Sequence, residues 1–171
     1  LAQQGQPAGA GCSASTRYAA FDANGNLSSE DDFNGNRTCL VFDVQRNLET
    51  TRVEGLAATT NCAAVTPVGA ALPAGARKVV REWHPSWSLK TRNTEPGRRT
   101  TWVYNGQPDP FNGYAIANCA SGATLPNGAP IAVVCKRVDE ATQDANGSQT
   151  GITQPSADPS INGVSLLLHL N

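Results

Sequence analysis

Several residue types are scarce or missing in this chain of 171 residues, and each shortage excludes a class of protein. Charged residues make up 16% of the sequence and the formal net charge is −1, so no basic field favours nucleic acid or an anionic membrane. No apolar run approaches the roughly 20 residues of a membrane-spanning helix, and no apolar stripe at helical spacing is long enough for a coiled coil. Methionine is absent, even at position 1, which predicts a processed product or a fragment.

Glycine and proline, by contrast, are plentiful, with 16 and 11 residues. The dipeptide Asn-Gly, which is typical of type I′ hairpin turns with positive φ at both central residues, occurs seven times, at Asn24, Asn34, Asn105, Asn112, Asn127, Asn146 and Asn162. Between these turns lie short segments rich in β-formers, at 39–42, 79–80, 100–104, 131–134 and 164–168. The sequence therefore predicts an all-β protein built from antiparallel hairpins.

Aromatic residues recur at a regular spacing along the chain. Phe42 follows Phe21 by 21 residues, and Tyr104 follows Trp83 by the same interval. A leucine stands six residues after three of these aromatics, at Leu27, Leu48 and Leu89. A period of about 20 residues suits two short strands and two turns, and stacked units bury a face that one unit leaves open.

The first of these units resembles the YD repeats of RHS proteins, the rearrangement-hotspot proteins related to Tc-toxin shells and to teneurins. The resemblance is carried by 18–27 (YAAFDANGNL), 32–38 (DFNGNRT) and 42–49 (FDVQRNLE), and the clear match covers 18–54. A looser match covers 79–105. The resemblance implies long β-sheets that spiral into a hollow shell, which in this family commonly encloses a C-terminal toxin domain.

The chain departs from the full family pattern. It is too short to close a shell, it contains no recognisable toxin domain, and its Asp-Pro segments at 109–113 and 158–163 have extra residues before the Gly of the family's self-cleavage motif. We therefore carry over the repeat architecture alone. The predicted fold is all-β, with antiparallel hairpin repeats of about 21 residues forming an open or spiralling sheet with two loop insertions. The expected parts are an irregular segment 1–15, YD-type repeats 16–54, a Gly/Ala-rich insertion 55–78, further repeats 79–105, a Cys-bounded insertion 106–136, and a repeat remnant with a terminal strand 137–171.

Five cysteines allow two disulfides and leave one thiol over. Cys119 and Cys135 flank a turn-rich loop, and a disulfide closing about 15 residues contributes ~3 kcal/mol in the chain-entropy model. Cys39 and Cys62 are the next predicted pair, which would pin the 55–78 insertion to the first repeat. Cys12 would then be unpaired, and for each cysteine the alternative is a buried apolar thiol.

The most chemically varied patch is 83–87, where Trp83 and a second tryptophan flank His84. Trp83 occupies a repeat-aromatic position and is predicted to pack inside the sheet layer, the alternative being contact with a ligand such as a sugar ring. Neither His84 nor His169 has a neighbouring cysteine or a Gly-x-Ser-x-Gly elbow, so we predict no metal, no cofactor and no catalytic residue. The oxygen-rich stretch 22–36 is interpreted as turn chemistry rather than a cation site.

These observations predict a non-catalytic structural segment of an exported or surface-displayed RHS-type protein, located outside the cell. The segment would form a sheet wall or self-associate into a fibre, because unpaired sheet edges template pairing with another copy. The rest of a longer protein or a toxin domain is a further possible partner, and neither nucleic acid nor a membrane span is expected. The apolar run 166–168 offers either a docking strand or a buried terminal strand. The alternative function is a carbohydrate- or receptor-binding module with exposed contacts Trp87, Trp102 and Tyr114.

Overall fold

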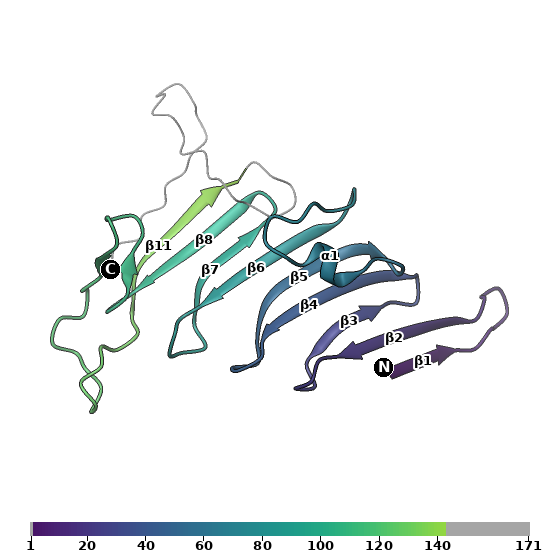
Figure 1. Ribbon diagram of the computed structural model, residues 1–171, viewed down its shortest axis with the longest axis horizontal. Helices are drawn as coiled ribbons and strands as arrows, with labels where there is room; N and C mark the ends of the chain where they lie inside the picture. Colours follow the sequence, from purple (N-terminus) through teal and green to yellow (C-terminus); the bar gives the residue numbers. More distant parts are fainter. Residues whose placement is uncertain (1, 143–171) are drawn as a thin grey trace, which may run out of the picture.

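The protein forms one open antiparallel sheet of nine strands, shown as a computed structural model in Figure 1. The structure describes residues 2–142. Its elements are β1 (Ala2–Gln6), β2 (Ser15–Phe21), β3 (Leu27–Asp31), β4 (Asn36–Asp43), β5 (Leu48–Ala57), α1 (Cys62–Val65), β6 (Arg77–Trp83), β7 (Lys90–Glu95), β8 (Arg98–Tyr104), β9 (Pro108–Asp109), β10 (Ala115–Ile116) and β11 (Val134–Ala141). The first eight strands follow one another in the sheet, and β11 returns to pair with β8. β9 and β10 form a separate two-stranded sheet between β8 and β11.

The predicted all-β class and the antiparallel pairing are confirmed. Each neighbouring pair of strands in the sheet is antiparallel, and α1, the one helix among residues 2–142, has four residues. The sheet does not close on itself, so β1 and β11 remain its two edges, as the fan of strands in Figure 1 shows. The predicted strand at 164–168 and the Asn-Gly pairs at 146 and 162 lie outside the described residues.

The expectation that 1–15 is irregular is wrong, because this segment contains β1. Its five residues pair with β2 in the register Ala2 to Ala19 through Gln6 to Ser15. All five are exposed, and none is β-branched or aromatic. The backbone hydrogen bonds offered by β2 therefore form this strand, since its own sequence has little preference for an extended conformation.

The Asn-Gly turns differ from the predicted type I′ geometry. Gly25 and Gly35 have φ of 84° and 79°, whereas the asparagines before them have negative φ. In the first turn, the carboxylate of Asp22 accepts hydrogen bonds from the backbone N–H groups of Asn24 and Asn26, each at 2.9 Å. The aspartate thus organises a longer loop in which glycine alone needs the left-handed conformation.

The main hydrophobic core lies where the 55–78 insertion covers the middle of the sheet. α1 packs over β4 and β5, and Cys62 at its start forms a disulfide with the buried Cys39 of β4. Asn61 caps this short helix by accepting a hydrogen bond from the N–H of Ala63 at 3.0 Å. The buried apolar side chains of this cluster are Cys39, Val53, Leu56, Val65 and Ala76, with Cys62 and Leu72 packed against them.

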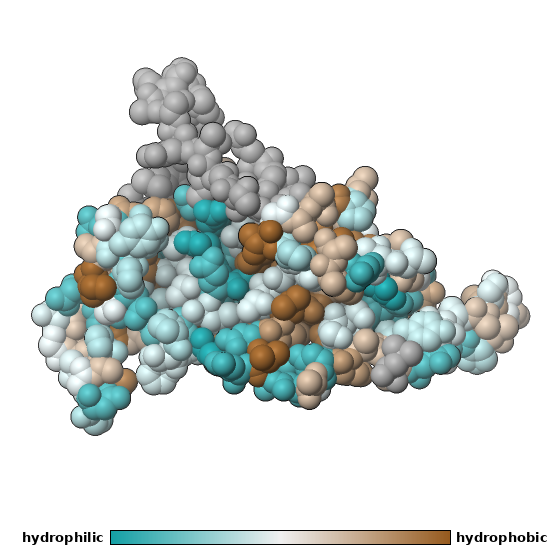
Figure 2. Space-filling view, viewed as in Figure 1, coloured by the Kyte–Doolittle hydropathy of each residue, from teal (hydrophilic) through white to brown (hydrophobic). Residues whose placement is uncertain are grey.

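The second insertion, between β8 and β11, encloses little apolar surface. Its large apolar side chains are mostly exposed, including Tyr114 at 71% and Ile116 at 62%. A disulfide between Cys119 and Cys135 closes it. Figure 2 shows that hydrophobic residues on the face in view form separate patches among hydrophilic ones.

Candidate functional site: the hairpin turns and the sheet edges

Three successive hairpins share one irregularity at the point where they turn. Ala20 pairs with Ser29 but Phe21 pairs with Leu27, so Ser28 is an extra residue opposite the step between Ala20 and Phe21. The same register shift occurs immediately before Phe42 and Trp83, where the extra residues are Thr50 and Thr91. A bulge bends its strand and increases the local twist. The three hairpins therefore bend at equivalent positions, each marked by an aromatic residue and an extra hydroxyl residue.

The aspartate-containing turns use their oxygen atoms within the turn itself. Asp32 repeats the bonding of Asp22: it accepts from the N–H groups of Asn34 and Asn36 at 2.8 and 2.9 Å, and from the side-chain amide of Asn36 at 2.9 Å. These hydrogen bonds, that from the Asn36 side chain foremost, lower the pKa of Asp32. They support the interpretation that the side-chain oxygens of 22–36 stabilise the turns. Within residues 2–142, no group of three or more His, Cys, Asp or Glu side chains converges as a metal site would require.

Neighbouring turns on the same end of the sheet are joined by side-chain amides. The side-chain NH₂ groups of Asn24 and Asn26 both donate to the Asn47 side-chain oxygen, at 3.1 and 3.0 Å, and Asn24 also donates to the carbonyl of Val44. Asn47 itself has a φ of 52°, one of two non-glycine residues with positive φ in the described chain. The β2–β3 and β4–β5 turns are thereby tied together by contacts between residues 20 to 23 positions apart.

Ion pairs tie the strands together on the face that the aromatics share. Glu49 lies between Arg52, at 2.7 Å, and Arg81 of the next strand. Burial acts to raise the pKa of Glu49, but the two guanidinium groups outweigh it and lower the pKa below its ordinary value. Arg17 and Glu30 form a further pair across β2 and β3 at 2.6 Å. Opposite charges facing each other across strands add to the stability of the sheet.

The two sheet edges differ in chemistry. β1 is short, uncharged and exposed along its whole length. β11 is longer, with eight residues, and carries two basic residues followed, after Val138, by two acidic residues. Within residues 2–142, β1 pairs with β2 alone and β11 with β8 alone. Each strand therefore presents backbone donors and acceptors along one side.

The residues predicted as ligand contacts lie on three separate elements. Trp87 is in the β6–β7 loop and 43% exposed, and Tyr114 lies in the second insertion. Trp102 is on β8 and half-buried, so the expectation that it is exposed is wrong. Within residues 2–142, no aromatic contact joins the three. They therefore form no common stacking platform.

The 83–87 patch instead anchors the β6–β7 loop to the sheet. His84 is buried, meets the ring of Tyr104 edge-on with 5.7 Å between ring centroids, and accepts a hydrogen bond at Nδ1 from the N–H of Ser86 at 3.1 Å. Burial, together with the positive charge of Arg46, lowers the pKa of His84. The indole N–H of Trp83 donates to the Glu49 carbonyl at 2.9 Å. This patch therefore has packing and turn roles.

The structure contains both predicted disulfides, Cys39–Cys62 and Cys119–Cys135, with Cys12 exposed and unpaired. Sequence reasoning missed two buried polar residues beside them. Asn105 accepts from the N–H of Cys119 at 3.1 Å and from that of Ala120 at 3.2 Å, and so shapes the second insertion. Lys78 is fully buried beneath the first insertion and donates to the Pro67 carbonyl at 2.8 Å.

No helix in residues 2–142 combines the length and apolar character needed to cross a membrane. Comparison of the chain with protein-family models, with curated proteins and with solved structures finds no match.

Proposed function

We propose that this chain is a structural, non-catalytic β-repeat segment of an exported or surface-displayed RHS-type protein, and that its edges associate with further copies. The observation that carries this proposal is the series of three hairpins with a register shift before Phe21, Phe42 and Trp83. These aromatics lie at the ends of alternate strands of one open sheet. Such a sheet extends by adding strands, and each added strand satisfies the backbone groups of the previous edge.

Two further observations support an extracellular wall. The chain has two disulfides, which persist in oxidising compartments. Its net charge of −1 provides little repulsion between copies. The side-chain amide contacts between neighbouring turns hold one hairpin beside the next. Such contacts suit a sheet that grows by adding similar hairpins.

The test is the mass of the purified chain in solution as its concentration rises. Light scattering is expected to show species heavier than the 17.9 kDa monomer, and electron microscopy is expected to show extended assemblies. The measurement uses Cys12→Ser to remove association through the exposed thiol. A single monomeric species at every concentration would contradict the proposed wall.

A binding module is the second candidate, and Tyr114 is the observation in its favour. This residue has a φ of 62° and is 71% exposed. A bulky side chain held in this rare backbone conformation is often functional. Glycan-array binding that is lost in Tyr114→Ala and kept in Phe111→Ala, a neighbouring exposed aromatic, would favour this alternative.

A further inference from the structure

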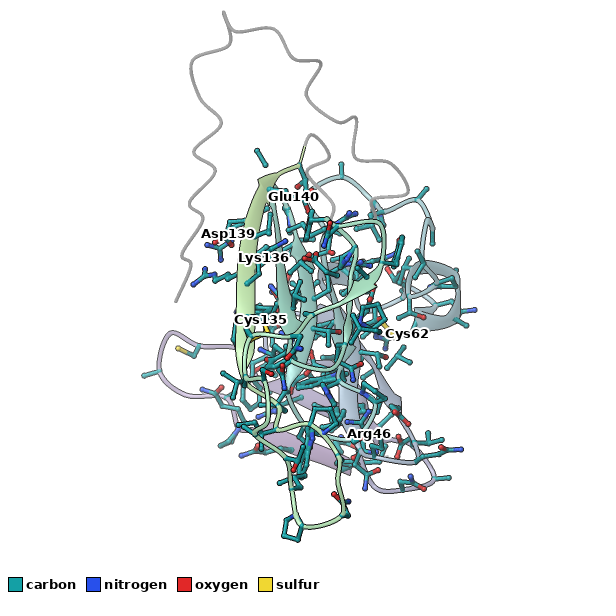
Figure 3. All side chains as sticks on the ribbon, turned by 90° about the vertical axis from the view of Figure 1, so that its left-hand side faces the viewer. Arg46, Cys62, Cys135, Lys136, Asp139 and Glu140 are labelled. Carbon is teal, nitrogen blue, oxygen red and sulfur yellow. A yellow bond between two sulfur atoms is a disulfide. The ribbon has the colours of Figure 1, made fainter. Side chains whose placement is uncertain are left out.

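The charges along β11 have an order that matches an inverted copy of the same strand. Residues 136–140 read Lys-Arg-Val-Asp-Glu. Figure 3 looks onto this side of the sheet, where Lys136, Asp139 and Glu140 lie along β11. The opposite side of β11 is already paired with β8 from Val134 to Ala141. A further strand of the sheet would therefore contact β11 along its outer backbone.

We propose that the outer edge of β11 pairs with β11 of a second copy, antiparallel and centred on Val138. In this register Lys136 faces Glu140 of the second copy, and Arg137 faces its Asp139. Each pairing occurs twice because of the two-fold symmetry, so four opposite-charge contacts form. The inference rests on the proposed self-association and assigns it to one edge and one register.

The alternation of side chains distributes these contacts over both faces of the joined sheet. Val138 faces Thr101 of β8, and Lys136 faces Val103, so these two β11 residues share a face. Arg137 and Asp139, opposite Trp102 and Thr100, share the other. Two charge pairs therefore form on each face, and the two Val138 residues, each already 5% exposed within its own copy, lie opposite each other at the centre.

Symmetric registers centred on any of the four charged residues of β11 are electrostatically unfavourable. A two-fold centred on Arg137 would place that residue opposite itself, and a centre on Asp139 would do the same for the carboxylate. Like charges directly opposite each other destabilise a strand pair. The Val138 register is the symmetric one in which all four charged residues face opposite charges, so the charge order favours this register and a second copy as the partner.

Most of the charged groups of β11 have partners within the chain that a second copy would have to share; Asp139, for example, accepts a hydrogen bond from the Thr100 hydroxyl of β8 at 2.5 Å. Arg137 is 51% exposed at its side chain and pairs at 3.0 Å with Asp139 on its own strand. Glu140 forms no ion pair within residues 2–142. Lys136 is held by Asp109, at 2.5 Å, and would share its charge between that residue and the second copy.

The test uses charge reversal and its rescue in the Cys12→Ser background at low ionic strength. Arg137→Glu and Asp139→Arg each place like charges opposite one another, so each should raise the dimer dissociation constant at least about tenfold. An equimolar mixture of the two variants restores every opposite-charge contact and should dimerise like the parent. Arg77→Glu is the matched control, because Arg77 is similarly exposed and ion-paired but lies on the interior strand β6.

Three outcomes separate this inference from the broader one. If the parent associates and Arg137→Glu associates equally well, the β11 register is overturned, and self-association must then occur through another surface. A parent that stays at 17.9 kDa overturns both. Loss of dimer in each variant with recovery in the mixture supports the register, provided that circular dichroism shows folded proteins.

Disulfide cross-linking tests the same register without relying on the charge-reversed variants. Facing Cα atoms in an antiparallel pair lie about 4.5 to 5.5 Å apart, within the range that a disulfide bridges. Val138→Cys should therefore give a disulfide-linked dimer on mild oxidation, whereas Val134→Cys, on the same strand but away from the centre, should not. Equal cross-linking at both positions would overturn the register.

Discussion

The two disulfide-closed insertions are held to the same sheet by different physical means. The first, over β4 and β5, buries Val65 and Ala76 against the strands, with the partly buried Leu72 packed beside them. The second, between β8 and β11, leaves Ile116 and Tyr114 largely exposed and relies on the buried side chain of Asn105. In this open sheet, an insertion can therefore serve as a local core or as a hydrogen-bonded loop, and the disulfide has a different role in each.

Removing the disulfides should produce the largest effects and should separate the two insertions. Chain entropy alone gives a similar loss for both loops, about 3 kcal/mol each. Cys39→Ser/Cys62→Ser also places a hydroxyl in the core, where Cys39 has no exposed surface, so the total loss in unfolding free energy should be about 4–6 kcal/mol. Cys119→Ser/Cys135→Ser should cost about 3 kcal/mol. Urea denaturation of the two variants measures both losses. Equal losses would mean that burial adds nothing at Cys39.

Truncation of one apolar side chain in each insertion should give unequal losses of stability. Leu56 is 1% exposed in the core beneath the first insertion. Leu56→Ala should lower the unfolding free energy by about 2–4 kcal/mol, because it leaves a cavity among packed side chains. Ile116→Ala in the second insertion should change the free energy by less than about 0.5 kcal/mol. A large loss at Ile116 in the same urea experiment would show that the second insertion has an apolar core after all.

The difference between the insertions was only partly predictable from sequence. Cysteine spacing predicted both pairings, and β-rich segments between turns predicted an antiparallel sheet. The burial of Lys78 was not predictable, because a lysine between Arg77 and Val79 is typical of a solvent-facing strand position. Asn105 was interpreted as half of an Asn-Gly turn. Its capture of two backbone N–H groups from residues 14 and 15 positions away depends on tertiary structure.

The geometry of the turns and the pairing of the edge strand β1 were likewise only partly predictable from sequence. Local composition predicted positive φ at Gly25 but not the aspartate-centred loop, which depends on the carboxylate reaching two N–H groups at once. Ala2–Gln6 has no strand propensity, and its pairing is determined by the neighbouring strand. The predicted 21-residue spacing places the aromatics at the ends of alternate strands, and the hydroxyl residues at the register shifts are a signal that sequence reasoning missed.

Loss of the Asn105 side chain should be the next largest effect, and it tests the hydrogen-bonded insertion directly. Asn105→Ala leaves the N–H groups of Cys119 and Ala120 and the carbonyl of Ile131 without their side-chain partner. The unfolding free energy should fall by about 2 kcal/mol. Asn112→Ala is the matched control, an exposed Asn-Gly asparagine of the same insertion, and should cost less than about 0.5 kcal/mol. Similar thermal stability of the two variants would contradict the role of Asn105.

The two lysines at the insertions provide the smallest expected difference and one that depends on pH. Lys136 forms an ion pair with Asp109, whose side chain is 9% exposed. Lys136→Met leaves that carboxylate without its partner and should cost about 1–2 kcal/mol at neutral pH. Lys78 has no carboxylate partner, and its ammonium group is bonded to one carbonyl. Lys78→Met should therefore change the unfolding free energy by no more than about 1 kcal/mol, and the change should be toward greater stability.

The sign of the pH dependence follows from the direction of the pKa shift. Burial lowers the pKa of Lys78, whereas in the unfolded chain the pKa returns to about 10.4. Between these two values the unfolded chain binds more protons than the folded protein, so stability rises with pH across that window. Below the folded pKa, the full cost of the buried charge is present. The stability gained by Lys78→Met should thus be largest at neutral pH and shrink as the pH approaches 10.4. Paired urea titrations of parent and variant at several pH values measure this. A difference that stays constant with pH would mean that Lys78 keeps an ordinary pKa beneath the first insertion.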